Sequence, residues 1–195
     1  DFVRAGQPLI VLQSTQIDAQ YNMVRDQLAV EQAATARLTA EKGNYAQIKF
    51  PEELQSRSKE PTIAEILQNE THLFNTRRET LNGEIALLHG QIAEVKTEIV
   101  ALESQIKATD STMGYLHEEL SVNEKLAEKG FIAKPRLLEF KRSLSGEADK
   151  QGEYGADIAR ARQKINELGL RIASLKHDYA TQASDALKTS QDKIF

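Results

Sequence analysis

The stretch LNGEIALLHGQIAEVKTEIVALESQI, residues 81–106, decides the fold of this chain. Apolar residues recur in it in alternating steps of four and three residues, at Leu81, Ile85, Leu88, Ile92, Val95, Ile99, Leu102 and Ile106. This heptad repeat places the apolar side chains on one stripe of an α-helix, which is the seam of a coiled coil. Leu116 and Leu120 keep the same phase further on. The pattern predicts one long outgoing helix over residues 62–128.

A second seam follows in residues 135–195, the predicted returning helix, at Ile158, Ala161, Ile165, Leu168, Ile172, Leu175 and Tyr179. Lys129-Gly130 interrupts the first helix, so residues 129–134 are the predicted hairpin tip, and Pro135 suits the first turn of the next helix. Two heptad helices joined by a short turn are antiparallel neighbours. Facing residues should then have numbers that add up to roughly 264, as Ile99 and Ile165 do.

The Gly-rich residues 151–155 fall opposite the weak stretch Thr109 to Met113 in this register. Because glycine costs about 1 kcal/mol against alanine inside a helix, we expect this to be the thinnest and most flexible part of the hairpin.

The chain before the hairpin divides into three shorter predicted segments. Residues 1–15 contain the strand-like run Leu9-Ile10-Val11-Leu12, and residues 16–43 form a first helix that ends at Gly43-Asn44. Residues 44–61 are an elbow loop, because the residue before each of Pro51 and Pro61 disfavours helix. The predicted fold is therefore all-α, a long antiparallel coiled-coil hairpin with an added N-terminal helix and a short β segment. The heptad seam of the first helix runs through Ile17, Tyr21, Val24 and Leu28, and Ala34, Thr35 and Leu38 continue it less cleanly.

The composition excludes several classes of function. The 195 residues include no Cys and no Trp, and interspersed charges sum to −4, so neither a thiolate metal site nor a basic surface for nucleic acid is present. The carboxylates and the four His residues are scattered along helices without a pocket, and no phosphate-binding glycine loop occurs. We expect no catalytic site, no metal and no cofactor. No apolar run is long enough to span a bilayer, so any membrane anchor is expected outside this chain, which reads as a fragment.

Several motifs resemble one known family. Val3-Arg4-Ala5-Gly6-Gln7-Pro8-Leu9-Ile10-Val11-Leu12 resembles the end of the first lipoyl half-motif of HlyD-type membrane fusion proteins. Phe50-Pro51-Glu52-Glu53-Leu54 and the region from Ile66 to Arg78 are similar to the adaptors of protease and lipase exporters in particular. Residues 1–15 are thereby identified as half of a lipoyl-like module, without a lysine that could carry lipoate or biotin.

The resemblance implies a location and partners. It implies a periplasmic adaptor of a Gram-negative type I secretion system, anchored in the inner membrane by a segment absent from this chain. Its partners would be an inner-membrane ABC transporter, a TolC-like outer-membrane channel and other copies of itself in a ring. The family also implies that a segment beyond Phe195 pairs with the first helix, so in this fragment that helix packs either on its own hairpin or on a neighbouring molecule instead. The hairpin tips of related adaptors carry an Arg, a Leu and a Ser, which align with Val122, Leu126 and Ala133, so only the Leu is kept.

The tip is the candidate site, as the contact surface for the outer-membrane channel. Phe131 and Ile132 are apolar residues between lysines, and exposed apolar side chains at the end of an arm often mark a contact surface. The alternative is that these two side chains only cap the bundle end against Leu126 and Leu138. The predicted contact residues are Leu126, Lys129, Gly130, Phe131, Ile132, Ala133, Lys134 and Pro135.

Two other functions share parts of this pattern. An adaptor of a multidrug efflux pump has the same hairpin, and the cargo lost on deletion would separate the two. A coiled-coil tether or scaffold would have no need of the lipoyl-like strand and would dimerise through its seam.

Overall fold

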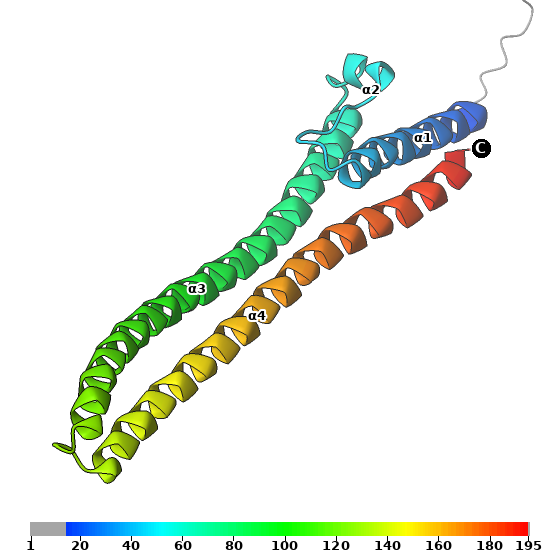
Figure 1. Cartoon of the computed structure of the whole chain (residues 1–195). Helices are drawn as coiled ribbons and strands as arrows, with labels where there is room; N and C mark the ends of the chain where they lie inside the picture. Colours follow the sequence, from blue (N-terminus) through cyan, green and yellow to red (C-terminus); the bar gives the residue numbers. More distant parts are fainter. Residues whose placement is uncertain (1–14, 195) are drawn as a thin grey trace, which may run out of the picture. The chain divides into compact units, whose positions relative to one another are not determined.

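The computed structural model describes residues 15–194 and contains four helices, shown in Figure 1. They are α1 (Thr15–Lys42), α2 (Glu52–Ser56), α3 (Pro61–Glu128) and α4 (Lys134–Ile194). The prediction of a helical chain built on a long hairpin is confirmed. Apart from Thr15, the predicted β segment lies outside the described residues. The chain forms two compact units, the first from residues 1–82 and 175–195 and the second from residues 83–174.

The second unit is the hairpin itself, in which α3 (green in Figure 1) runs beside α4 (yellow). Ion pairs join Glu124 to Lys141 at 3.2 Å and Glu103 to Arg162 at 3.8 Å. Both pairs agree within one residue with the predicted antiparallel register.

The seam of the second unit is covered along its length. Ile158, Leu168 and Ile172 of α4 are buried. The seam positions of α3 are half-buried, because only one helix covers them, at Ile85, Leu88, Ile92, Val95, Ile99, Leu102, Ile106, Leu116 and Leu120. Both helices continue unbroken through the predicted weak point, where Gln151 Nε2 donates to Asp110 Oδ1 at 2.6 Å. The expected flexibility there stays a prediction.

The first unit contains an apolar cluster between α1, α2 and the beginning of α3. Leu54 of α2 and Ile63 of α3 are fully buried against Ala29 and Ala33 of α1. The small alanines allow the helices to approach closely. The elbow is therefore not loop throughout, because α2 forms within it to deliver Leu54 to this cluster. Pro51 directly precedes α2, where a missing N–H leaves no helical hydrogen bond unmade.

Of the two alternatives for the first helix, the second half of α1 packs on its own hairpin. Leu38 of α1 packs with Ala183 and Leu187 of α4. Glu31 of α1 accepts hydrogen bonds from Ser190 at 2.6 Å and from Lys193 at 2.9 Å. The last turns of α4 thus supply the helix on which α1 packs.

The apolar positions predicted for the first half of α1 are largely exposed. The exposed fractions are 65% for Ile17, 65% for Tyr21 and 58% for Val24. The buried apolar positions of α1 are Ala29, Ala33, Leu38 and Ala40, of which only Leu38 belongs to the predicted seam. The heptad prediction followed the large apolar side chains of the first half, whereas three of these four buried positions are alanines.

The end of α1 shows how the chain turns into the elbow. Asn44 has a positive φ of 49°, and Tyr45 N–H reaches back to the Ala40 carbonyl at 2.9 Å. Asn44 N–H bonds the Glu41 carbonyl at 3.0 Å, which completes a Schellman motif. Arg78 of α3 then donates to the carbonyls of Tyr45 and Ala46, which holds the start of the elbow on α3.

Candidate functional site: the hairpin tip

A Schellman motif ends α3 and begins the tip. Gly130 has a φ of +78°, Gly130 N–H bonds the Ala127 carbonyl, and Phe131 N–H bonds the Leu126 carbonyl, both at 3.0 Å. This left-handed conformation favours glycine, since any Cβ strains it. The motif ends α3 at a defined residue and turns the chain away from the helix there. The position of Phe131 therefore follows from the local sequence.

Three exposed apolar side chains form a surface that we call the tip stripe: Val122, Leu126 and Phe131. Val122 and Leu126 lie one helical turn apart on the same face of α3, and their exposed fractions are 58% and 37%. Phe131 is 76% exposed and occupies the motif position whose side chain typically contacts that of Leu126. The stripe includes two of the three positions that align with the family trio, Val122 and Leu126.

The two interpretations of the tip differ in where Phe131 and Ile132 lie. Ile132 is half-buried, whereas Phe131 is among the most exposed large apolar residues of the described chain. Leu138, which the capping alternative would cover, is 54% exposed. Capping therefore accounts for Ile132 and leaves Phe131 available for contact.

The remaining predicted tip residues are exposed. Lys129, Gly130 and Ala133 lie in the turn, while Lys134 is the first residue of α4 and Pro135 follows in its first turn. Neighbouring charges pair locally: Arg136 with Glu139 at 2.6 Å, and Lys141 with Glu124. The Arg136 guanidinium also lies over the Phe140 ring, 5.1 Å from its centroid. Of these contacts, the Lys141–Glu124 pair joins α4 to α3, and the other two lie within α4.

A second group of charged residues, which the sequence reasoning missed, lies in the first unit; we call it the arginine–glutamate cluster. Arg37 donates to Glu70 at 2.5 Å and to Glu41 at 2.8 Å, and Glu41 has no exposed side-chain surface. The second oxygen of Glu41, Oε2, lies 3.5 Å from Arg77 Nη1 without forming a hydrogen bond. The cluster ties α1 to α3 by charge, next to the buried Leu38 and Ala40 of α1.

The pKa values in this cluster follow from its burial and pairing. Burial alone would lower the pKa of Arg37, but the hydrogen bonds to Glu70 and Glu41 outweigh it and raise that pKa. Burial, together with the charge of Glu41, raises the pKa of Tyr179. Arg77 lies over the Tyr179 ring at 5.8 Å from the centroid, so α4 joins the cluster as well. The group is a structural junction that joins α1, α3 and α4.

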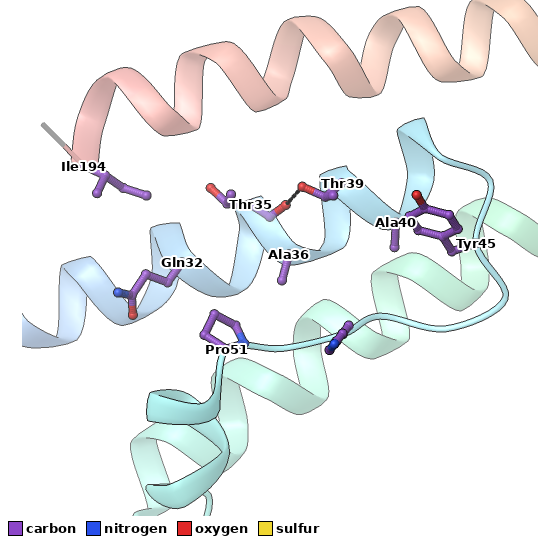
Figure 2. Close-up of a pocket in the computed structure, with 9 residues that line it drawn as sticks. Gln32, Thr35, Ala36, Thr39, Ala40, Tyr45, Pro51 and Ile194 are labelled. Atoms are coloured by element: carbon purple, nitrogen blue, oxygen red, sulfur yellow. Dashed lines mark hydrogen bonds between the residues drawn. The ribbon is translucent and has the colours of Figure 1, made fainter.

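Figure 2 shows the groove of about 350 Å³ beside α1, between the elbow and the end of α4. Its wall is mainly apolar, with Pro51 and Tyr45 on one side and Ile194 on the other. Thr39 turns its hydroxyl to the Thr35 carbonyl at 2.7 Å, so that hydroxyl is already bonded. Lys49 is the one charged residue of the lining. This arrangement contains no acid–base pair.

Two searches over the described residues bear on other kinds of site. Between residues 15 and 194, no three His, Asp or Glu side chains gather closely enough to hold a metal ion. None of the helices in that range is long and apolar enough to cross a membrane.

Comparisons with known proteins agree with this architecture. A family model described as "AprE, long alpha-helical hairpin" matches residues 17–195. The type I secretion system membrane fusion protein PrsE of Rhizobium meliloti is 30% identical over 194 residues, which cover 100% of this chain and 44% of PrsE. The alkaline protease secretion protein AprE of Pseudomonas aeruginosa is 33% identical over 189 residues, covering 97% of this chain and 44% of that protein.

A solved structure shares the fold. The crystal structure of the soluble domain of LipC, a membrane fusion protein of a type I secretion system, matches with a TM-score of 0.85 at 23% identity. The match covers 96% of this chain and 88% of the LipC chain. This chain spans less than half the length of the two curated relatives, so it corresponds to one part of proteins of that kind.

Proposed function

Because this chain belongs to the AprE family of long α-helical hairpins, we propose that it is the periplasmic arm of an adaptor for type I protein secretion. In this role, the full-length protein links an inner-membrane ABC exporter to a TolC-like outer-membrane channel. The names of both relatives support a secretion role, and that of AprE supports a protease-like cargo. The arm itself has no catalytic step to perform. It acts by holding two membrane complexes together.

The observation that carries this proposal is the tip stripe at the turn of the hairpin. Phe131 is 76% exposed, and Val122 and Leu126 extend the same apolar surface along α3. Burial of an apolar surface under a partner protein lowers the free energy of the complex, so an exposed apolar surface on a fixed turn favours binding. Val122 and Ala133 stand where related adaptors carry an Arg and a Ser, so docking here relies on apolar contact rather than on those polar groups. We assign the channel contact to the tip stripe with the adjoining turn residues.

The proposal is tested by placing charges on the tip of the full-length protein. Phe131→Asp combined with Ile132→Asp should abolish secretion of the cargo and co-purification of the channel. Phe131 is 76% exposed and Ile132 is half-buried at the end of the bundle, so helicity and melting should stay nearly intact. Secretion at the normal level by this double variant, present in normal amounts, would overturn the assignment.

Leu138→Asp provides the matched control. Like Phe131, Leu138 is an exposed apolar residue near the turn, but it lies outside the tip stripe. Secretion should persist in that variant. Loss of secretion in both variants would mean that the stripe has no special role. Loss of drug tolerance with intact protein secretion, on deletion of the whole protein, would favour an efflux adaptor instead.

A further inference from the structure

Three exposed lysines, which we call the tip lysines, stand beside the apolar tip stripe. Lys125 follows Val122 by three residues and Lys129 follows Leu126 by three, a spacing at which side chains are neighbours on a helix surface. Lys134 is the first residue of α4, on the other side of the turn. The stripe is therefore bordered by positive charge where it reaches the turn.

The charges of the tip lysines are not neutralised within the hairpin. None of the three forms an ion pair with a residue in the part of the chain that the structure describes. The other basic side chains at this end, Arg136 and Lys141, are paired with Glu139 and Glu124. The remaining acid at the turn, Glu128, lies by helical spacing on the far side of α3 from the tip stripe.

The positive charge is confined to the outermost part of the second unit. Residues 122–141 include five basic and three acidic residues, whereas the rest of that unit includes eight basic and twelve acidic ones. On the side of the tip stripe, the nearest acids of α3 are Glu118 and Glu119, about one turn before Val122. They border the stripe at the end that lies away from the turn.

Helix stability accounts for only part of this arrangement. Lys125 and Lys129 lie at the C-terminal end of α3, where the helix dipole favours cations. Lys134 lies at the N-terminal end of α4, where the dipole disfavours a cation, and the first turn of α4 contains no acidic residue. Lys134 therefore lowers the stability of the hairpin taken alone, and an external partner gives a reason for its charge.

We propose that the tip lysines bind carboxylates of the outer-membrane channel, which surround the apolar contact made by Phe131. The inference rests on the proposed adaptor role and adds the chemistry of the surface on which the tip docks. Complementary charge selects and orients the partner, while burial of the tip stripe supplies binding free energy. None of the tip lysines stands at a position aligned with the Arg, Leu and Ser of related adaptors, so this contact differs from the one that those residues make.

An anionic phospholipid surface is the other partner with which lysines beside an exposed aromatic ring are compatible. Segments that bind anionic lipid typically carry a cluster of about four to eight basic residues. Here a fixed turn divides the three tip lysines. The smaller number and the fixed geometry favour a protein surface.

Charge reversal tests the proposal in the full-length protein in cell envelopes. The combined variant Lys125→Glu, Lys129→Glu and Lys134→Glu should reduce co-purification of the channel at least about tenfold. Co-purification by the wild type should fall as NaCl is raised from about 0.05 M to about 0.5 M, because salt screens exposed charges. Lys107→Glu is the matched control and should dock normally, since Lys107 is an exposed lysine of α3 outside residues 122–141.

Lys134→Glu alone separates binding from stability. The change places an acid at the N-terminal end of α4, so the melting temperature of the purified protein should rise or stay unchanged. Co-purification of the channel should nevertheless decrease. Damage to the hairpin cannot explain that combination. Melting below the wild type would show that Lys134 serves the hairpin and would remove it from the binding surface.

Carbodiimide cross-linking identifies the groups that the lysines meet. The reagent activates a carboxyl group, a lysine amine in contact with that group forms an amide, and the carbodiimide leaves as a urea. The wild type should give an adduct with the mass of adaptor plus channel. Arginine at all three positions should rescue the docking that glutamate abolishes, because the charge is kept, and should remove the adduct, because the guanidinium group stays protonated.

Four results would overturn the inference: normal docking by the triple glutamate variant, docking that is independent of salt, an adduct that survives the arginine substitutions, or lysine-dependent binding to anionic phospholipid vesicles with unchanged channel docking. Loss of docking by Phe131→Asp with Ile132→Asp, but not by the triple glutamate variant, would reject the role of the lysines and keep the tip assignment. Normal docking by both variants would reject the tip assignment as well.

Discussion

Arg37 donates from Nη1 to Glu41 Oε1 at 2.8 Å, and this pair is the most deeply buried ion pair among the described residues. The side chain of Glu41 has no exposed surface and that of Arg37 is 9% exposed. Glu70 and Arg77 of α3 supply the other charges of the arginine–glutamate cluster. At this place buried ion pairs hold α1 on α3, whereas apolar side chains hold the two helices of the hairpin together.

Glu41→Gln should strongly destabilise the first unit. The change removes the negative charge between Arg37 and Arg77, and breaking a buried ion pair costs about 3–5 kcal/mol. Urea unfolding of the purified protein followed by circular dichroism measures the loss. Glu139→Gln is the control, since the Arg136–Glu139 pair is largely exposed and should contribute little. Equal losses of unfolding free energy in the two variants would show that the arginine–glutamate cluster contributes no more than an exposed ion pair.

Acid should weaken the contact between α1 and α4 through Glu31. The hydrogen bond from Ser190, then that from Lys193, lowers the pKa of Glu31 below its ordinary value of 4.5. A carboxylate with a lowered folded-state pKa stabilises the fold above its unfolded pKa and loses that contribution as the pH falls through the folded pKa. The wild type should therefore be more stable than Glu31→Gln at pH 7, and the difference should shrink as the pH falls below 4.5 and disappear only below the lowered pKa of Glu31. A difference in unfolding free energy that stays constant between these pH values would contradict this.

Glycine substitutions should have opposite signs at two places in the hairpin. Gly130→Ala puts a Cβ at φ +78° and should destabilise the tip by about 1 kcal/mol. Gly169→Ala lies inside α4, where a Cβ meets nothing within 4 Å, and should stabilise by about 1 kcal/mol. Thermal melting of the two variants beside the wild type gives both signs in one measurement. Stabilisation by Gly130→Ala would mean that the left-handed turn does not form.

Two residues of α3 that are two positions apart should differ sharply in their tolerance of charge. Ile99→Asp places a carboxylate in the half-buried seam and should cost at least ~2 kcal/mol, because no other core compensates. Ala101→Asp, two residues on and exposed, should leave the melting temperature nearly unchanged. Similar melting temperatures for the two variants would contradict the seam.

The hairpin could be predicted from sequence because its determinants are local and periodic. The Ile and Leu residues of the seam repeat in steps of three and four residues. The break at Gly130 is short, so the two helices that it joins must pair antiparallel. Glu103 and Arg162 meet as that pairing requires. The position of Phe131 follows from the same break, through the Schellman motif.

The first unit was harder to predict because its contacts join distant segments through residues with ambiguous patterns. Glu41 is a charged residue in a helix, which normally indicates a solvated face, and only Arg37, Glu70 and Arg77 together explain its burial. Helix α2 has five residues, too few for any periodicity, and it is stabilised by the burial of Leu54. The alanines of α1 give a weak apolar signal beside Ile17 and Tyr21, although the alanines make the contact.

The layered seam of the second unit makes the reach of the arm an adjustable length. Each layer touches only the layers above and below it, so seven residues inserted in α3 together with seven at the level position in α4 would preserve every remaining contact. One such paired insertion lengthens the hairpin by about 10 Å without moving the tip stripe relative to the turn. The length of a hairpin built this way can therefore be changed in steps of one heptad, by the number of layers alone.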